Sequence, residues 1–332
     1  RAACKQILLS LKLPVYLEGT SGLREDPDLN PFAIKSGDRL LSLGLHKRLY
    51  DGVLRLGGVP TVRVWRDLDN ANCPVSVLSI HHLEFAGLGR GWFLQAPLSV
   101  ISAMMLEGAV PLRRSLAEAS MDSSSSDLLA LDSRIEKQVK DLLQRYSNSE
   151  SSMVFHLSKL VGCNDIMYVG NSLSIRQWDN FGQRVKRIVV DANRGVNGID
   201  GQISTFLGLA RAKVHNWGLF GDLTTLYNLE APWILPCLEA DSGTIVVMNN
   251  AGGKIFEGIF RSELFQNNQQ LDFRKWAEMW NLSYECWQSV ENVCRQGEIV
   301  GRGHRGWRVV EIRPDAQQSK NFNTQFEALW KN

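Results

Sequence analysis

The sequence predicts an α/β protein of two domains with mainly parallel sheets flanked by helices. Three observations support this fold class. The chain has 332 residues, enough for two domains at ~150 residues each. Its composition, 44% hydrophobic and 22% charged, is typical of a globular protein with ample material for a core. Short apolar runs also alternate with helical lengths along the chain, as in α/β folds.

The first 120 residues are expected to form one of these domains. Short apolar runs, which are typical of strands, alternate there with amphipathic or polar stretches. The four runs are Pro14–Leu17, Gly52–Leu56, Val75–Ile80 and Gly91–Leu94. We therefore assign residues 1–120 to an α/β domain with its own sheet.

A shift in composition marks the boundary between the domains. The run Met121–Asp127 is polar and contains the serines Ser123–Ser126. Such a run buries too little surface to order itself and is typical of a linker. A helix is expected from Leu128 to Tyr146, because apolar residues recur there at helical spacing. Residues 121–150 are therefore assigned to a linker and a connecting helix.

Residues 151–332 are expected to form the second domain. Its apolar runs are mostly continuous, as in strands buried on both faces of a parallel sheet. The expected strands are Ile166–Val169, Ile188–Val190, Trp217–Phe220, Thr244–Met248 and Trp307–Ile312. The expected helices are Asp200–Lys213, Thr224–Ala240 and Asp272–Trp280.

Charge and composition exclude two kinds of partner. The 37 Lys and Arg residues nearly balance the 35 Asp and Glu residues, so neither a nucleic acid nor a membrane surface is expected. The most apolar stretch, Trp92–Leu106, contains polar residues and is shorter than the ~18–20 residues of a membrane span. The 6 cysteines form no CxxC pair, which favours a reduced, cytoplasmic protein. Small molecules are the expected ligands.

The segment from Gly221 to Gly253 carries the clearest chemical signal. Asp222 follows one expected strand and Asn250 follows the next. Because the carboxyl ends of parallel strands meet at one edge, we expect the two residues to be neighbours. A carboxylate, an amide oxygen and a loop carbonyl suit Mg²⁺ and not Zn²⁺, and the glycines let the backbone approach a diphosphate. A structural interpretation stays open, in which Asp222 caps a helix and Asn250 adopts a left-handed turn.

Three further features accompany this pair. Val169–Arg176 (VGNSLSIR) follows the first strand of the second domain, and Asn193–Gly201 (NRGVNGIDG) follows the second. Leu223 stands where most thiamine diphosphate (ThDP) enzymes have a second Gly. Together these features resemble the 2-succinyl-5-enolpyruvyl-6-hydroxy-3-cyclohexene-1-carboxylate synthases, the ThDP enzymes of menaquinone and phylloquinone biosynthesis. The resemblance is specific from about Ser151 to Phe256 and weak before residue 120.

The resemblance implies a fold and a cofactor. Residues 1–120 would be the family's Rossmann-like central domain, and residues 151–332 its ThDP diphosphate-binding domain. Mg²⁺ (or Mn²⁺) would be bound by Asp222, Asn250 and the backbone carbonyl of Gly252. The cofactor would contact these residues together with Gly221 and Leu223, and the apolar side chain of Ile199 would hold it in a bent conformation.

The resemblance also implies the substrates, 2-oxoglutarate and isochorismate. Each carries two carboxylates, which the planar forks of arginine are best suited to hold. Polar residues of the pocket would be Asn171, Ser172, Arg176 and Arg194. Its apolar wall would be Ile255 and Phe256, and Arg63 is a weaker match to a basic residue of the central domain.

The implied reaction is that of a transferase, in which 2-oxoglutarate is decarboxylated and the succinyl carbanion adds to isochorismate. The family's catalytic glutamate lies on an N-terminal pyrimidine-binding domain that no part of residues 1–120 matches. We therefore expect no catalytic residue of this kind in the chain, and we expect the chain alone to be inactive. Because such active sites form between subunits, the full enzyme is expected to be a homodimer or homotetramer.

The sequence departs from the family in two places, and two alternative functions stay open. Asn228-Leu229-Glu230 replaces the usual Asp-Leu-Asn, and Ala251 interrupts a usual run of three Asn; these changes bear on affinity and not on fold. The alternatives are another ThDP-dependent lyase or decarboxylase of 2-oxo acids, and a non-catalytic binding remnant of the fold. The expected location is the cytoplasm, or the plastid if the source is a plant or an alga.

Two other motifs have a structural interpretation. Gly301–Gly306 matches GxGxxG, but a dinucleotide fingerprint opens a helix, whereas a strand is expected to follow here. It is therefore predicted to be a tight basic turn. His81-His82 lacks a third ligand at a familiar spacing, so no metal site is expected there.

Overall fold

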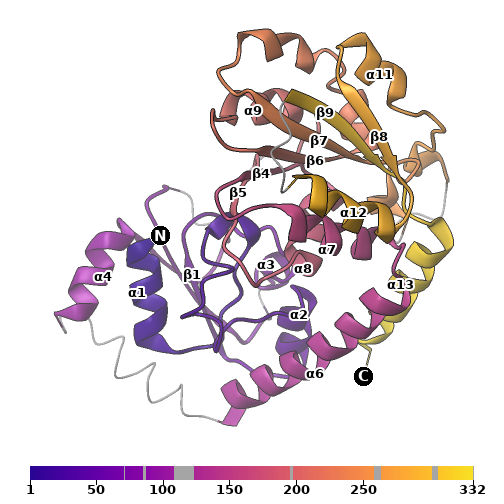
Figure 1. Cartoon of the computed structure of the whole chain (residues 1–332). Helices are drawn as coiled ribbons and strands as arrows, with labels where there is room; N and C mark the ends of the chain where they lie inside the picture. The colour runs from indigo at the N-terminus through magenta and orange to yellow at the C-terminus, as the bar shows by residue number, and fades with distance from the viewer. Residues whose placement is uncertain are drawn as a thin grey trace. The chain divides into compact units, whose positions relative to one another are not determined.

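The computed structural model describes residues 1–70, 72–84, 87–107, 123–194, 197–257, 263–300 and 306–331. The chain divides into two compact units, Arg1–Val139 with Leu329–Asn332, and Lys140–Ala328 (Figure 1). The described strands form one parallel sheet of three strands and one of six. The predicted α/β class with mainly parallel sheets is confirmed.

The first unit contains the sheet β1-β2-β3, formed by Gly52–Leu56, Ser76–His81 and Trp92–Gln95. Its helices are α1 (Ala2–Leu11), α2 (Arg39–His46), α3 (Arg63–Asp67) and α4 (Leu98–Leu106), with a 3-10 turn η1 at Gly19–Ser21. Alternate residues of β2 point to opposite faces. Ile80 packs with Ile7 and Ile101 from α1 and α4, whereas Val77 packs with Trp65 from α3. Helices therefore cover both faces of this sheet.

The prediction of a strand at Pro14–Leu17 is wrong. Only Val15 pairs there, in an isolated parallel bridge to Ala33. Proline has no N–H to donate, which shortens any ladder at this point. Leu17 packs instead with Leu23, Leu29 and Ala33 in a small separate cluster.

The connecting helix α6 extends over Ser123–Arg145. It therefore includes the serines of the polar run, which are helical and not an extended linker; Met121 and Asp122 lie outside the described residues. Serine readily occupies the first turn of a helix, and the turns that follow supply a continuous apolar face. That face is buried at Leu128, Ile135, Val139, Leu142 and Leu143.

The second unit contains the sheet β5-β4-β6-β7-β9-β8. Its strands are β4 (Ile166–Val169), β5 (Val189–Asp191), β6 (Asn216–Gly221), β7 (Ser242–Met248), β8 (Ser283–Trp287) and β9 (Gly306–Ile312). Five of them were predicted, with ends that differ by at most two residues. The edge strand β8 was not predicted, because its sequence mixes polar and apolar residues and only Trp287 is fully buried.

The helices of the second unit are shorter than expected. The helix predicted at Thr224–Ala240 is interrupted, because Pro232 and Pro236 cannot continue an α-helix. It consists of α10 (Asp222–Leu226) and the 3-10 helix η2 (Ala231–Cys237). The others are α7 (Glu150–Leu160), α8 (Leu173–Phe181), α9 (Gln202–Leu209), α11 (Arg274–Met279), α12 (Val290–Val300), α13 (Ala316–Ala328) and the 3-10 turns η3 (Lys254–Phe256) and η4 (Glu263–Gln266).

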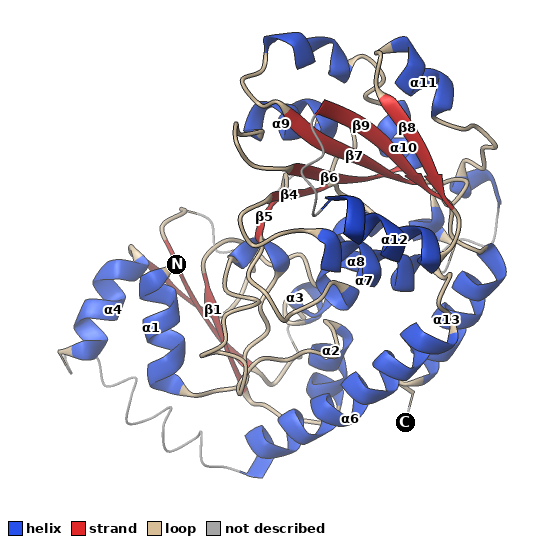
Figure 2. Ribbon diagram, in the orientation of Figure 1, coloured by secondary structure: helices blue, strands red, loops and turns tan. Residues whose placement is uncertain are grey.

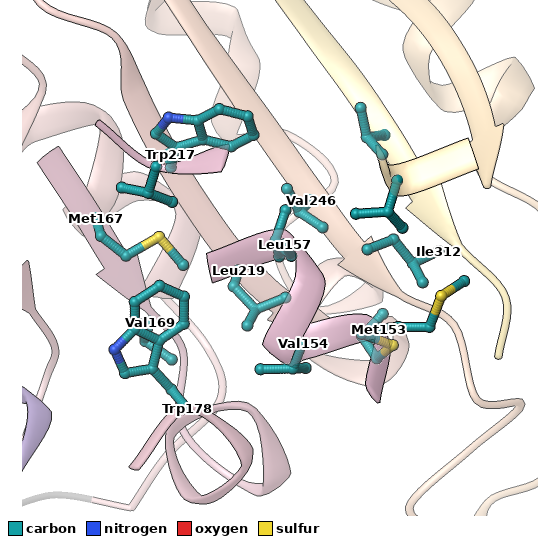
Figure 3. Close-up of a cluster of buried hydrophobic side chains, with 14 of the residues drawn as sticks. Met153, Val154, Leu157, Met167, Val169, Trp178, Trp217, Leu219, Val246 and Ile312 are labelled. Carbon is teal, nitrogen blue, oxygen red and sulfur yellow. The ribbon is translucent and has the colours of Figure 1, made fainter. Parts of the chain in front are cut away.

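Helices α7, α8 and α12 lie on one face of this sheet, and α9 and α11 lie on the other (Figure 2). Met153, Val154 and Leu157 of α7 are at most 1% exposed and pack over the strands, as Figure 3 shows. This packing fixes the position of α7 against the sheet. Among the described helices, none is long and apolar enough to cross a membrane. Of the GxGxxG motif, Gly301–Arg305 lie outside the described residues, and Gly306 begins β9.

Candidate functional site

The candidate site lies at the carboxyl edge of the six-stranded sheet. Gly221 and Met248, the last residues of β6 and β7, are direct partners across the two strands. Asp222 and the loop that begins at Asn249 therefore leave the sheet side by side. Chain order reverses direction between β4 and β6, so the site lies beside a switch point of the kind at which open α/β sheets bind ligands.

The buried carboxylate of Asp222 connects these two segments. Its Oδ2 accepts hydrogen bonds from the N–H of Gly252 at 2.7 Å and from Nε2 of Gln269 at 2.6 Å. Its Oδ1 accepts one from the N–H of Leu223 at 2.8 Å. Burial raises the pKa of Asp222, and these hydrogen bonds oppose the rise.

Asn250 presents its amide in a defined orientation. Nδ2 donates a hydrogen bond to Oε2 of Glu150 at 2.9 Å. Oδ1 is buried and has no hydrogen-bond partner among the described residues. A buried polar oxygen without a partner is costly, and an amide oxygen is a ligand that Mg²⁺ accepts.

The loop that follows Asn250 is left-handed at Ala251 (φ 65°) and Gly252 (φ 135°). A Cβ at Gly252 would lie 2.6 Å from the backbone oxygen of Gln266, so only glycine fits there. The left-handed turn therefore does not involve Asn250. The carbonyl of Gly252 accepts a hydrogen bond from the N–H of Lys254 at 2.9 Å and keeps its second lone pair.

The donor set fits a hard divalent cation in its chemistry. It offers a carboxylate oxygen of Asp222, the amide oxygen of Asn250 and a backbone carbonyl, and no sulfur or imidazole. Among the described residues, no group of three or more His, Cys, Asp and Glu side chains is placed to hold a metal ion. The predicted set contains one carboxylate and is not a group of that kind.

Two residues of this edge were missed by sequence analysis. Gln269 donates to both Asp222 and Asn249, at 2.6 and 2.9 Å. Glu150, only 7% exposed, faces Asn250. Burial raises the pKa of Glu150 to about 7, Asp222 and Glu257 also favour the rise, and Asn250 and Lys254 oppose it. No spacing signal marks either residue, and Glu150 belongs to a polar patch that the sequence assigns to the connecting segment.

Residues predicted to hold the substrate lie after β4 and β5, which are neighbours. Nη1 of Arg194 donates to Oδ1 of Asn171 at 2.6 Å, and Nδ2 of Asn171 donates to the carbonyl of Gly198 at 2.8 Å. Arg176 is exposed and donates to the carbonyl of Ser172, a residue with φ 70°. The structure thus brings Asn171 and Arg194 into contact, and Arg176 and Ser172 into a second pair. Gly195 and Val196 of this motif lie outside the described residues.

The remaining predicted residues are distributed over both units. Ile199 and Leu223 are half-buried, and the carbonyl of Ile199 accepts a hydrogen bond from Nδ2 of Asn228 at 3.0 Å. Asn228, where the sequence departs from the family, is fully buried and also donates to Thr224 of α10.

The expected apolar wall and the expected basic residue belong to η3 and to the first unit. Both residues of the wall belong to η3, with Ile255 half-buried and Phe256 exposed. Arg63 belongs to the first unit, where its side chain is 79% exposed and its Nε lies 3.9 Å from Oδ1 of Asp67.

Comparisons with known proteins identify proteins that are similar to this chain. No family model matches the chain. Proteins named 2-succinyl-5-enolpyruvyl-6-hydroxy-3-cyclohexene-1-carboxylate synthase are similar to it over almost its whole length. That of Bdellovibrio bacteriovorus is 36% identical over 98% of this chain and 58% of the relative. That of Akkermansia muciniphila is 32% identical over 97% of this chain and 58% of the relative. The chain thus spans a little over half the length of these relatives.

Proposed function

Over the part of those proteins that it spans, the chain belongs to the family of 2-succinyl-5-enolpyruvyl-6-hydroxy-3-cyclohexene-1-carboxylate synthases, and we propose that it supplies the cation- and diphosphate-binding part of such an enzyme. The reaction proposed for the whole protein joins 2-oxoglutarate, after loss of CO₂, to isochorismate in menaquinone or phylloquinone biosynthesis. When bound, thiamine diphosphate supplies the electron sink for this chemistry.

The cofactor is proposed to bind to the second unit. Asp222, Asn250 and the carbonyl of Gly252 would bind Mg²⁺ or Mn²⁺, and through it the diphosphate, with Gly221 and Leu223 beside them. Ile199 would support the cofactor from the neighbouring loop. The observation that carries the proposal is the buried Oδ1 of Asn250, which has no hydrogen-bond partner in the part of the chain that the structure describes. It lies in the same loop whose Gly252 N–H donates to the buried carboxylate of Asp222.

The substrate carboxylates are proposed to bind beyond the strand β4. Arg194 is oriented by its hydrogen bond to Asn171 and offers further N–H groups of its planar fork to a carboxylate. Arg176 and Ser172 would form the second polar part of the pocket. The apolar wall is proposed at Ile255 and Phe256, and Arg63 is a further candidate for binding a carboxylate.

Turnover and cation-dependent cofactor binding test the proposal together. In the full-length product of the gene, ThDP with Mg²⁺ should raise Tm, and CO₂ should be released from 2-oxoglutarate when isochorismate is present. Asp222→Ala should abolish both effects, because the cation loses its charged ligand. Turnover of pyruvate and not of 2-oxoglutarate would favour another ThDP-dependent lyase. If the protein neither binds ThDP nor turns over either substrate, a non-catalytic remnant is favoured.

Assembly and location are proposed on the same basis. A homodimer or homotetramer in the cytoplasm suits an enzyme that acts on small molecules. The mass of the native protein in solution, measured by light scattering, tests the assembly. A monomer that turns over both substrates would contradict it.

A further inference from the structure

We propose that Glu150 is a positioning residue of the cation site, because its carboxylate fixes the amide of Asn250 so that Oδ1 faces the cation. The inference rests on the proposed function and extends it to a residue outside the ligand set. Glu150 is 7% exposed, and its Oε2 lies 2.9 Å from Nδ2 of Asn250.

The two ends of the Asn250 amide differ in what they can bind. One end of an asparagine side chain donates hydrogen bonds and the other accepts them, and only the accepting end can bind a cation. Oε2 of Glu150 accepts from Nδ2 of Asn250, so Glu150 holds the nitrogen end of the amide. Oδ1 is then left buried, without a hydrogen-bond partner among the described residues.

The backbone holds Glu150 in place for this role. It is the first residue of α7, and its N–H donates to Oγ of Ser319 at 3.0 Å. The cap of the helix is Ser149, which accepts from the N–H of Ser152. The positive end of the helix dipole stabilises a carboxylate at this position. The buried apolar face of α7, shown in Figure 3, keeps that end at the edge of the sheet.

The charges around Glu150 also favour a cation. The carboxylates of Asp222 and Glu257 raise the pKa of Glu150, and the ammonium group of Lys254 lowers it. Two acidic groups thus share this edge with Glu150, opposed by one ammonium group. A divalent cation at Asn250 and Asp222 would relieve their repulsion.

Mn²⁺ is a suitable probe, because its binding can be followed by electron paramagnetic resonance without turnover. In the full-length protein with ThDP present, Glu150→Gln should weaken Mn²⁺ binding by about tenfold or more, as loss of a residue that orients a ligand does. The introduced amide can either accept from Nδ2 or donate to Oδ1 of Asn250, so the variant no longer enforces one orientation of Asn250. The matched control is Glu257→Gln, which removes a nearby charge without touching Asn250 and should change the affinity less than about threefold.

A double variant separates orientation from simple structural support. Asn250→Asp alone places two carboxylates in contact and should weaken Mn²⁺ binding. When Asn250→Asp is combined with Glu150→Gln, the amide introduced at position 150 donates a hydrogen bond to the carboxylate introduced at position 250. The net charge is that of the parent, and a carboxylate oxygen faces the cation. The double variant should therefore bind Mn²⁺ more tightly than either single variant, to within about threefold of the parent.

Each outcome supports or overturns the role of Glu150. The inference is overturned if Glu150→Gln binds Mn²⁺ within about twofold of the parent, or if the double variant is no better than the single ones. Urea unfolding in the presence of a chelator shows whether each variant is folded. A parent protein that binds neither Mn²⁺ nor ThDP overturns the proposed function and this inference with it. A parent that binds both, with an unaltered Glu150→Gln variant, overturns the inference alone.

Discussion

Each of the two sheets buries an arginine, and the two lie in different surroundings. Arg308 of β9 is 1% exposed, and it donates to Oγ1 of Thr244 at 3.0 Å and to Oε1 of Glu285 at 3.1 Å. Arg55 of β1 is 4% exposed and lies over the ring of Trp65 at 5.1 Å. None of its side-chain nitrogens has a hydrogen-bond partner among the described residues. Burial lowers the pKa of both guanidinium groups, and Glu285 opposes this for Arg308.

The same contrast holds at the carboxyl edges of the sheets. In the second unit, Glu311, Asn249, Gln269 and Asp222 form one chain of hydrogen bonds. In the first unit, His81 ends β2 with its Nε2 buried and unpartnered among the described residues. The two sheets share a parallel topology, so topology alone does not make a site. A connected chain of polar side chains, with Oδ1 of Asn250 beside it, distinguishes the edge where the candidate site lies.

The largest effect is expected from breaking the polar chain at Glu311. This carboxylate is fully buried and accepts hydrogen bonds from Asn249, the N–H of Phe273, Tyr284 and Arg313. Glu311→Ala leaves these donors unpaired and should lower the free energy of unfolding by about 3–5 kcal/mol, measured by urea denaturation. The exposed Glu278 provides the control, since Glu278→Ala should change it by less than ~0.5 kcal/mol. Equal effects of the two changes would contradict the role of the polar chain.

A somewhat smaller effect is expected at the glycine of the site loop. Gly252→Ala strains the backbone and places a Cβ against the oxygen of Gln266, so it should destabilise the protein by about 2–3 kcal/mol. It should also weaken the contact with Asp222. A Cβ at Gly208, on α9, would have nothing within 4 Å, and Gly208→Ala should stabilise by about 0.5–1 kcal/mol. Thermal unfolding should therefore show a lower Tm for Gly252→Ala and a higher Tm for Gly208→Ala. A Gly252→Ala variant with an unchanged or higher Tm would show that the loop can relax.

The two arginines sharpen the comparison directly. Arg308→Met should destabilise by about 2 kcal/mol, because Glu285 and Thr244 lose a buried partner. Arg55→Met removes a buried cation without a hydrogen-bond partner among the described residues and should stabilise by about 1 kcal/mol, although it also loses the contact with Trp65. Parallel urea titrations of both variants test this. A destabilised Arg55→Met variant would mean that the guanidinium group is satisfied in solution.

The smallest effect is expected at Ala251, a residue of the site loop that departs from the family. Its φ of 65° is unfavourable for a residue with a Cβ by roughly 1–2 kcal/mol. Ala251→Gly should therefore raise the free energy of unfolding, by about 0.5–1 kcal/mol after the entropy that glycine loses. Ala130→Gly, at an exposed position of α6, should lower it by about 1 kcal/mol. A loss of stability at both positions would contradict strain at Ala251.

The sequence predicted the buried strands of the second unit better than its edge strand β8, for a physical reason. Strands such as β7 are buried on both faces, and their continuous apolar runs differ from all neighbouring segments. The edge strand β8 has a solvated side and carries no such run. The run at Pro14–Leu17 is apolar for another reason, because it contributes Leu17 to a small cluster outside the sheet.

The candidate site could be predicted only where residues follow strands. Asp222 and Asn250 were expected to be neighbours, because parallel strands deliver their ends to one edge. Glu150 reaches that edge from the start of a helix 100 positions before Asn250, and Gln269 reaches it from a loop. Long-range packing places these two side chains at the edge, so no local sequence pattern could predict their position.

The hydrogen bond between Arg194 and Asn171 has a consequence for binding entropy. A free arginine side chain has many rotamers, and a ligand that immobilises it loses about 0.5–1.5 kcal/mol of affinity. Here Asn171, itself 1% exposed and held by the carbonyl of Gly198, already restricts the guanidinium group. A carboxylate that arrives at Arg194 therefore meets a side chain whose freedom was lost when the chain folded.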